Sequence, residues 1–355
     1  MFDVLIQGGE VVGGERHDRP ERADVGINGG RIQAVGDLAN AAAARVIDAS
    51  GLTIAPGFID VHVHSEIALL GGKHRHAGLL QGVTTQLMAP DGFGWAPLGS
   101  ADAAALWDTL YFSVGMRQPR SEFPTVESYL SLFDRGIPGN LVPQVPHCAL
   151  RTATVGWDNR GPTSSELERM KELVAQWMDA GAVSLCLGLD YQPSAFATTD
   201  ELIELAKTTR EMGGIYAAHI RYNRLGREGA WRETLEVSRR AEIPVHVSHE
   251  VVDDLSEAML ADGDDITFES YLYPAKCTHL TTVLPSWAQE DGAPGLRDRL
   301  KDWAFRYEIS SHLEEHFSSS LAKGESAVFA DTPTRCRVSR LNASESRIEV
   351  SCDPV

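Results

Sequence analysis

The sequence lacks three features that would each mark a particular class of protein. It has 32 basic residues against 50 acidic ones, a formal net charge of -18, and this field argues against nucleic-acid binding. No apolar run approaches the roughly 18 residues of a membrane span. The N-terminus carries no basic stretch ahead of an apolar one. We therefore expect a cytoplasmic protein without nucleic-acid or membrane partners.

Paired cysteines are also missing. The chain has 5 cysteines, an odd number, widely scattered and without a Cys-x-x-Cys pair, which argues against a disulfide framework and a zinc finger. What is present is an ordinary globular composition, with 43% hydrophobic and 23% charged residues in 355. That length fits one large folded domain or two medium ones.

The secondary-structure pattern of the sequence changes near residue 55. Residues 1–55 contain short strand patterns, including Val4–Gln7, Glu10–Val12, Asp24–Ile27, Ile32–Val35 and Val46–Asp48. The Asn28-Gly29-Gly30 step predicts a hairpin, because these residues tolerate the positive φ of tight turns. This stretch predicts a small β-domain.

Residues 56–335 alternate β-branched runs with amphipathic helical stretches about 30 residues apart, the length of a βα unit. Helices are predicted at Thr199–Met212 and Glu228–Ala241, and a helical lid within Ser100–Ser131. The predicted strands are Phe58–His64, Thr84–Met88, Leu141–Val145, Val183–Leu187, Ile215–Ala218, Val245–His249 and Ile266–Tyr271, with Ala327–Ala330 as a weak eighth. We expect an α/β fold, a (β/α)8 TIM-like barrel, followed by an irregular tail at 336–355.

Two histidines lie two residues apart at the end of the first barrel strand. Alternation along Phe58–His64 places His62 and His64 on one face, at the end of the barrel where barrel enzymes place their active sites. The H-x-H spacing lets both rings reach one metal ion, at about 2.0–2.1 Å if that ion is zinc. The alternative is a hydrogen-bonded pair of core histidines.

Two more histidines favour the metal interpretation. His219 and His249 each close a predicted strand, one βα unit apart, and such strand ends converge on the barrel axis. Asp91, which follows the second strand, would hold or bridge metal ions; the alternative is an Asp-Gly turn with Gly92. His246 alternates away from His249 and is predicted to face the helices.

Longer motifs carry a resemblance that runs from the N-terminus to about Arg335. They include Ala55-Pro56-Gly57-Phe58-Ile59-Asp60-Val61-His62-Val63-His64, Gln81-Gly82-Val83-Thr84-Thr85, Gly188-Leu189-Asp190-Tyr191-Gln192-Pro193, Tyr216-Ala217-Ala218-His219-Ile220-Arg221 and Ile243-Pro244-Val245-His246-Val247-Ser248-His249. With these motifs the chain resembles the amidohydrolase superfamily, and within it the N-acyl-D-amino-acid deacylases, or D-aminoacylases.

The resemblance implies a composite β-sandwich with a zinc-dependent barrel that hydrolyses the amide of an N-acylated D-amino acid. It implies that His219 and His249 form the tight metal site and that His62 and His64 form the weaker one. Asp91 aligns with the cysteine that bridges the metals in the family, and a carboxylate is a harder ligand than a thiolate. By the same resemblance Tyr191 and Tyr273 face the substrate, and Arg221 is placed to hold its carboxylate.

This chain departs from the family pattern at two places. The family's Ser-His-His-Lys is Ser248-His249-Glu250-Val251 here, which removes a substrate-binding lysine. The metal-binding Asp that follows the last barrel strand in the family has no matching motif, and Asp331 is only a weak candidate for that acid and for the general base. We expect barrel closure to be incomplete or supplied by Ala327–Ala330.

Three functions stay open at this point. The leading one is a metal-dependent hydrolase of an amide bond, in which an acidic residue moves the water's proton to the leaving nitrogen. The second keeps the fold but acts on a cyclic amide or a lactone. The third is a shortened relative that binds metal without turnover, favoured by the missing Asp motif and opposed by the intact histidine set.

Overall fold

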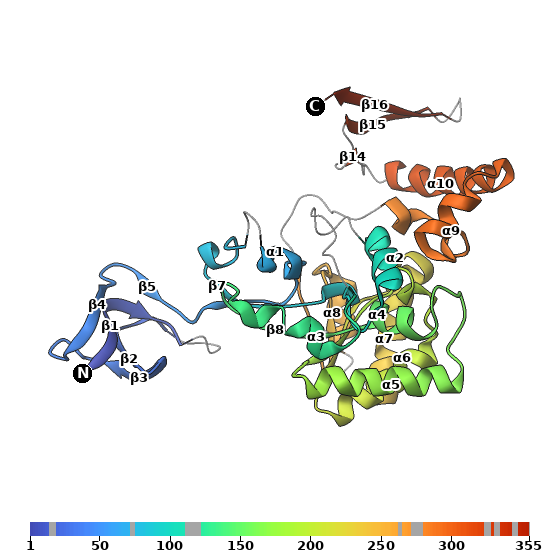
Figure 1. Cartoon of the computed structure of the whole chain (residues 1–355). Helices are drawn as coiled ribbons and strands as arrows, with labels where there is room; N and C mark the ends of the chain where they lie inside the picture. Colours follow the sequence, from blue (N-terminus) through green and yellow to red (C-terminus); the bar gives the residue numbers. More distant parts are fainter. Residues whose placement is uncertain are drawn as a thin grey trace. The chain divides into compact units, whose positions relative to one another are not determined.

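The structure is a computed structural model that describes residues 1–13, 19–71, 75–110, 122–261, 265–270, 280–322, 328–329, 334–342 and 347–354. They form two compact units, Met1–Ile59 with Gln81–Thr84, and Asp60–Leu80 with Thr85–Val355. Figure 1 follows the order of the elements along the chain. No helix of the described residues is both long and apolar enough to cross a membrane.

The first unit is a five-stranded sheet with the order β3-β2-β1-β4, to which β5 adds beside β1. Its strands are β1 Phe2–Val11, β2 Glu21–Asn28, β3 Arg31–Gly36, β4 Ala43–Asp48 and β5 Thr53–Ile54. Gly29 and Gly30 have φ of +57° and +72° between the antiparallel β2 and β3, so the predicted hairpin is confirmed.

Most of the remaining strands lie in the second unit, while β6 and β7 begin with residues of the first. Five of them form one sheet in the order β13-β12-β11-β10-β9, and β8 pairs in parallel with β7. Their bounds are β6 Phe58–Asp60, β7 Val83–Leu87, β8 Asn140–Val142, β9 Val145–Pro146, β10 Ser184–Gly188, β11 Ile215–His219, β12 Val245–Val247 and β13 Ile266–Phe268. The strand predicted at Leu141–Val145 is divided into β8 and β9, and Pro143, which has no N–H to donate, lies between them.

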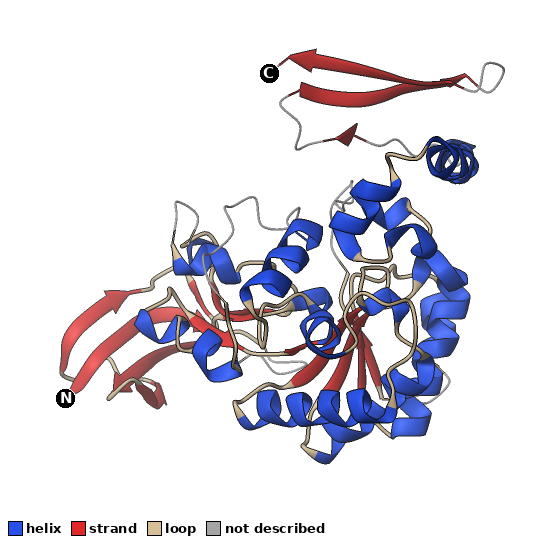
Figure 2. Ribbon diagram, turned by 45° about the vertical axis from the view of Figure 1, so that its right-hand side comes forward, coloured by secondary structure: helices blue, strands red, loops and turns tan. Residues whose placement is uncertain are grey.

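Helices pack against the five-stranded sheet, as Figure 2 shows. They are α4 His147–Thr154, α5 Ser164–Asp179, α6 Thr199–Glu211, α7 Tyr222–Ala241 and α8 Asp254–Leu260. The helix predicted from Thr199 is confirmed, and its cap is Thr198, whose hydroxyl accepts the Glu201 N–H at 3.2 Å. Between helices and sheet lies a core that includes the fully buried Trp177 and Trp231.

Shorter elements complete the unit. The remaining helices are α1 Glu66–Leu70, α2 Ser100–Leu110, α3 Val126–Leu130, α9 Gly292–Arg299 and α10 Trp303–Ala322. Turns of 3₁₀ helix are η1 Leu79–Gln81, η2 Pro90–Gly92, η4 Phe133–Arg135, η5 Ser194–Phe196, η6 Leu280–Val283 and η7 Ser286–Gln289. The predicted helical lid corresponds to α2 and α3, while residues 111–121 between them lie outside the described residues.

The C-terminal segment differs from the prediction. Val328–Phe329 (β14) pairs antiparallel with β15 (Thr334–Asn342), and β15 pairs with β16 (Arg347–Pro354), in a separate three-stranded sheet. The segment therefore does not supply the eighth parallel strand, and the tail expected to be irregular contains two strands. A register shift between Val338 and Arg340 breaks the alternation that would have revealed them. Asp331 lies outside the described residues.

Candidate metal centre

Residues that follow β6 and β7 meet in a first group of possible ligands. His62 and His64 follow β6 by two and four residues, and Asp91 lies in the η2 turn after β7. His62 Nε2 lies 3.6 Å from Asp91 Oδ1, and His64 Nε2 lies 3.5 Å from Asp91 Oδ2. The two oxygens of one buried carboxylate thus face two histidines.

Two further histidines form a second group around the same carboxylate. His219 is the last residue of β11, and His249 follows β12 by two residues. His249 Nε2 lies 3.6 Å from Asp91 Oδ1, and His219 Nδ1 lies 4.0 Å from the same atom. The two rings also approach each other, with His219 Nδ1 at 2.8 Å from His249 Nε2. Asp91 is therefore common to both groups.

The Asp91 carboxylate fits a bound cation. Its Oδ1 is buried and accepts no hydrogen bond from the described residues, a costly state for a carboxylate oxygen. Ligands held about 2.0–2.1 Å from a tetrahedral zinc ion lie roughly 3.3 Å from one another. The distances of 3.5 and 3.6 Å between Asp91 and three imidazoles are close to that separation. Imidazole and carboxylate are donors that zinc accepts.

Two outer carboxylates hold the rings of His219 and His62. Asp190 Oδ2 lies 3.0 Å from His219 Nε2, and its Oδ1 accepts the Asn223 N–H at 3.0 Å. Glu269 Oε1 lies 2.8 Å from His62 Nδ1. Each contact leaves the opposite ring nitrogen facing Asp91, as the outer partners of metal-binding histidines do. The sequence reasoning missed both acids, although each follows a parallel strand, Asp190 by two residues and Glu269 directly.

Burial and charge oppose each other in this cluster. Burial disfavours the imidazolium of His62, but the Asp91 and Glu269 carboxylates outweigh it and raise the pKa of His62 to about 10. Burial likewise penalises the charged Asp91, yet His62, His249 and His64 hold the pKa of this carboxyl well below its usual range. The surrounding histidines therefore hold Asp91 in its ionised form.

The η2 turn presents Asp91 through an uncommon backbone. Ala89, Asp91 and Gly92 have φ of 58°, 55° and 70°. A Cβ on Gly92 would come within 2.6 Å of the Cys186 carbonyl oxygen in β10, so only glycine fits this close approach. The turn interpretation and the ligand interpretation of Asp91 are therefore compatible, because the turn points the carboxylate at the histidines.

The prediction for His246 is wrong. Its Nε2 contacts Glu269 Oε2, so it lies on the side of His62 rather than against the helices. Alternation does not extend from His246 to His249, because β12 ends at Val247 and His249 has a φ of 40°.

The three residues expected to contact substrate have different placements. Tyr191 is buried, with its ring centroid 4.8 Å from that of His219 and 4.9 Å from that of Phe93. Arg221 is only 2% exposed and is directed at protein acceptors. Its donors reach the Glu233 carboxylate at 3.0 Å and the carbonyl oxygens of Ala195 and Ala197 at 2.7 and 3.0 Å. Arg221 thus holds the loop after β10. Tyr273 lies outside the described residues.

Comparison with known sequences identifies related proteins. The sequence model of the amidohydrolase family matches residues 45–282. D-aminoacylase from Alcaligenes xylosoxydans xylosoxydans is 35% identical over 293 residues, which are 79% of this chain and 59% of that protein. N-acyl-D-glutamate deacylase of the same organism is 32% identical over 295 residues, 79% of this chain and 58% of that protein. The chain thus spans somewhat more than half the length of these relatives.

Comparison with solved structures finds relatives of the same kind. A D-aminoacylase studied for its binuclear metal centre superposes with a TM-score of 0.67 at 31% identity, covering 77% of this chain and 59% of that one. The N-acyl-D-glutamate deacylase from Bordetella bronchiseptica, in complex with zinc and a phosphonate inhibitor, gives a TM-score of 0.67, also at 31% identity and with the same coverage.

Proposed function

Because this chain belongs to the amidohydrolase family, we propose that it is a metal-dependent hydrolase that cleaves the amide bond of an N-acylated D-amino acid. The observation that carries the proposal is the buried Asp91 carboxylate, whose Oδ1 lacks a donor among the described residues and faces imidazoles from three separate segments. The identities of the relatives support the same reaction class.

His62, His64, Asp91, His219 and His249 would hold one or two zinc ions. Such an ion supplies Lewis-acid chemistry, polarising a carbonyl and acidifying a water. The chain's own residues fix the geometry of the ligands: Asp190 orients His219, and Glu269 orients His62.

Aromatic side chains border the centre. The Phe93 ring lies 5.2 Å from His64 and the Tyr191 ring 4.8 Å from His219, centroid to centroid, and both aromatic residues are 5% exposed. They keep water from the backs of the ligands and strengthen the local electrostatics. We propose that Tyr191 also borders the acyl-amino-acid substrate. Tyr273 retains its predicted substrate role, and Arg221 is left out of the substrate site because its donors serve the loop.

We assign no general base to the described residues. Asp190 and Glu269 are the acids nearest the histidines, and their carboxylate oxygens already contact protein groups. Both Asp190 oxygens and Glu269 Oε1 accept hydrogen bonds, and Glu269 Oε2 lies against His246 Nε2. Moving a proton from water to the leaving nitrogen requires a carboxylate with an open lone pair. Asp331 retains only its weak sequence-based claim.

The finer architecture is part of the proposal. We propose that the parallel strands belong to a (β/α)8 barrel over residues 56–335 and that residues 1–55 contribute to a small β-sandwich. The substrate would be a small molecule, and a cytoplasmic location remains a prediction.

The test combines metal analysis with substrate assays on the purified chain. We expect bound zinc by elemental analysis and hydrolysis of N-acetyl-D-amino acids in preference to their L-enantiomers, both lost in His219→Ala. Hydrolysis of hydantoins or lactones instead would replace the substrate class. Metal binding without turnover of any of these would favour the non-catalytic alternative.

A further inference from the structure

The backbone of His249 is strained. Its φ of 40° lies in the left-handed region, which is unfavourable for a residue with a side chain and is typical of functional sites. Such a conformation persists only where neighbouring contacts enforce it. Glu269 enforces it from one side, since its carboxylate accepts the His249 N–H at 2.9 Å and its carbonyl oxygen accepts the Glu250 N–H at 2.8 Å.

The next residue, Glu250, anchors the other side. Its side chain is buried, with 2% of the residue exposed, and receives four donors. The donors are Arg227 Nε at 2.8 Å, Trp231 Nε1 at 2.7 Å, the Tyr222 hydroxyl at 3.3 Å and the Val251 N–H at 2.6 Å. Three of these donors belong to α7, so Glu250 fastens the segment after His249 to that helix.

Arg227 extends the anchor along the same segment. Beyond Glu250 it donates to the Val251 carbonyl oxygen at 2.9 Å and to Asp253 Oδ1 at 2.9 Å. Its guanidinium therefore holds residues 250–253 at three points. The α7 helix can present Arg227 in this way because Gly226, with a φ of 66°, bends the helix just before it.

We propose that Arg227 and Glu250 are positioning residues that hold His249 in its strained conformation and so set the affinity of the metal centre. The proposal rests on the proposed metal-binding function. With the segment after His249 fixed to α7 and its amide fixed to Glu269, the His249 ring points Nε2 at Asp91 and His219. Without the anchor, the backbone relaxes and the ring turns from that direction.

The primary test measures zinc affinity by competition with a chromophoric chelator. We expect Glu250→Gln and Arg227→Met to weaken zinc binding about 10- to 100-fold, the range for lost outer partners of metal ligands. Arg227→Lys, which keeps one donor, restores part of the affinity. Unchanged affinity in both Glu250→Gln and Arg227→Met would overturn the proposal and leave the metal centre intact.

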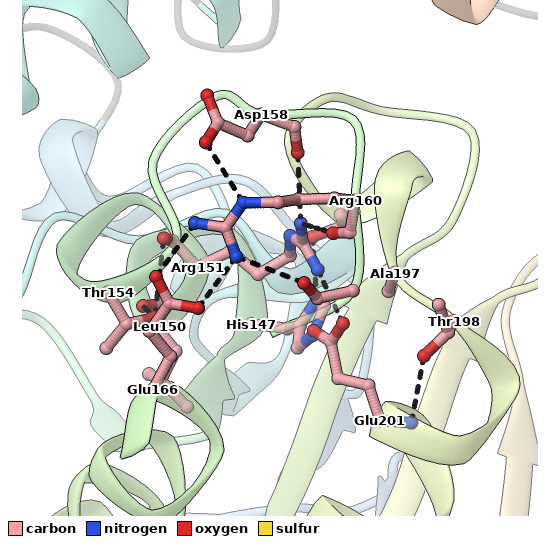
Figure 3. Close-up of polar contacts among 12 residues, drawn as sticks. His147, Leu150, Arg151, Thr154, Asp158, Arg160, Glu166, Ala197, Thr198 and Glu201 are labelled. Carbon is pink, nitrogen blue, oxygen red and sulfur yellow. Dashed lines mark hydrogen bonds and ion pairs between the residues drawn. The ribbon is translucent and has the colours of Figure 1, made fainter. Parts of the chain in front are cut away.

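Glu201→Gln is the matched control. Glu201 is another buried carboxylate paired with an arginine, Arg151 (Figure 3). Its side chain contacts Arg151 and His147, neither of which is a proposed ligand. We expect this variant to lower the melting temperature without changing zinc affinity. Equal losses of affinity in Glu201→Gln and Glu250→Gln would show a general effect of stability and reject the positioning role.

A second readout needs no metal. Hydrogen exchange of the His249 amide, followed by NMR in the metal-free protein, should become at least 10-fold faster in Arg227→Met and stay unchanged in Glu201→Gln. This measurement stands even if the wild-type chain binds no zinc, a result that would reject the proposed function. Unaltered exchange in Arg227→Met would reject the anchor itself. Because Arg227 is 28% exposed at its side chain, this variant also replaces Glu250→Gln if the latter does not fold.

Discussion

Two clusters of histidine and carboxylate lie in the same unit, and they are organised in opposite ways. In the first, His147 Nδ1 lies 2.8 Å from Ser194 Oγ and His147 Nε2 lies 3.1 Å from Glu201 Oε1, while Arg151 donates to Glu201 Oε2 at 2.5 Å. In the second, Asp91 Oδ1 faces three imidazoles and accepts no hydrogen bond from the described residues.

The difference separates a structural cluster from a binding site. Ser194, His147 and Glu201 are the residue types of a hydrolytic triad, yet they are 1%, 0% and 1% exposed, so no substrate reaches them. Both carboxylate oxygens of Glu201 have hydrogen-bond partners, His147 and Arg151, whereas Asp91 Oδ1 has none among the described residues. Residue types alone therefore do not identify a site; the open lone pair does.

The largest expected effect removes a ligand from the second cluster. His219→Ala should lower zinc affinity by more than about 100-fold, since even outer partners of metal ligands contribute roughly 10- to 100-fold. Elemental analysis after dialysis checks it. The matched change His147→Ala should destabilise the fold but retain zinc, and loss of zinc in both variants would contradict the comparison.

The second-largest effect is expected when the ion pair of the first cluster is broken. Glu201→Gln leaves the buried Arg151 without its charged partner, and breaking such a pair costs about 3–5 kcal/mol. Urea unfolding monitored by circular dichroism measures the free energy of unfolding. A loss under about 1 kcal/mol, the range of an exposed ion pair, would show that the pair is not structural.

Exchanging the shared ligand sharpens the comparison. Asp91→Cys should keep a bound ion and shift preference about 10-fold from manganese toward zinc, because a thiolate is softer than a carboxylate. Asp91→Ala should lose the ion. Competition titrations with both metals provide the measurement, and equal preferences in Asp91→Cys and the wild type would argue against direct ligation.

The smallest effect concerns pH. Burial lowers the pKa of His147 from 6.5, with Arg151 and Arg221 adding to the shift and Glu201 opposing it. Below pH 6.5 the unfolded chain takes up a proton that the folded chain refuses, so stability falls with decreasing pH. His147→Gln should reduce that slope by at most about 1.4 kcal/mol per pH unit. Unfolding titrations between pH 5 and 8 test it, and an unchanged slope would mean His147 is charged in the fold.

The spacing of histidines at the ends of predicted strands revealed the cluster around Asp91, because parallel strands converge at their carboxyl ends. His219 and His249 could be found that way, as could the H-x-H pair and Asp91. Asp190 and Glu269 were missed, since a single acid in a loop has no distinguishing spacing. For Glu250 the sequence indicated only that the family's lysine motif is not kept. Its role as an anchor could not be predicted, because its partners lie on α7 and depend on the bend at Gly226.

The fold shows a similar division. Strands with regular alternation or long apolar runs could be predicted from the sequence, and β10 and β11 agree with their predicted ranges within one residue. Interruptions of strands could not be predicted from the sequence. Pro143 divides one predicted strand into two, and a register shift conceals β15. Such interruptions are decided by tertiary pairing rather than by the local pattern.

The close approach of η2 to β10 restricts how far the backbone of Asp91 can move. A Cβ on Gly92 would come within 2.6 Å of the Cys186 carbonyl oxygen, and one on Gly188 would meet the Asp91 carbonyl oxygen, so turn and strand lie backbone against backbone. Asp91 has no room to withdraw. Calcium takes its ligands at about 2.3–2.6 Å, whereas zinc and magnesium take theirs near 2.0–2.1 Å. If the cluster holds a metal ion, as proposed, we therefore expect it to bind zinc or magnesium more tightly than the larger calcium ion.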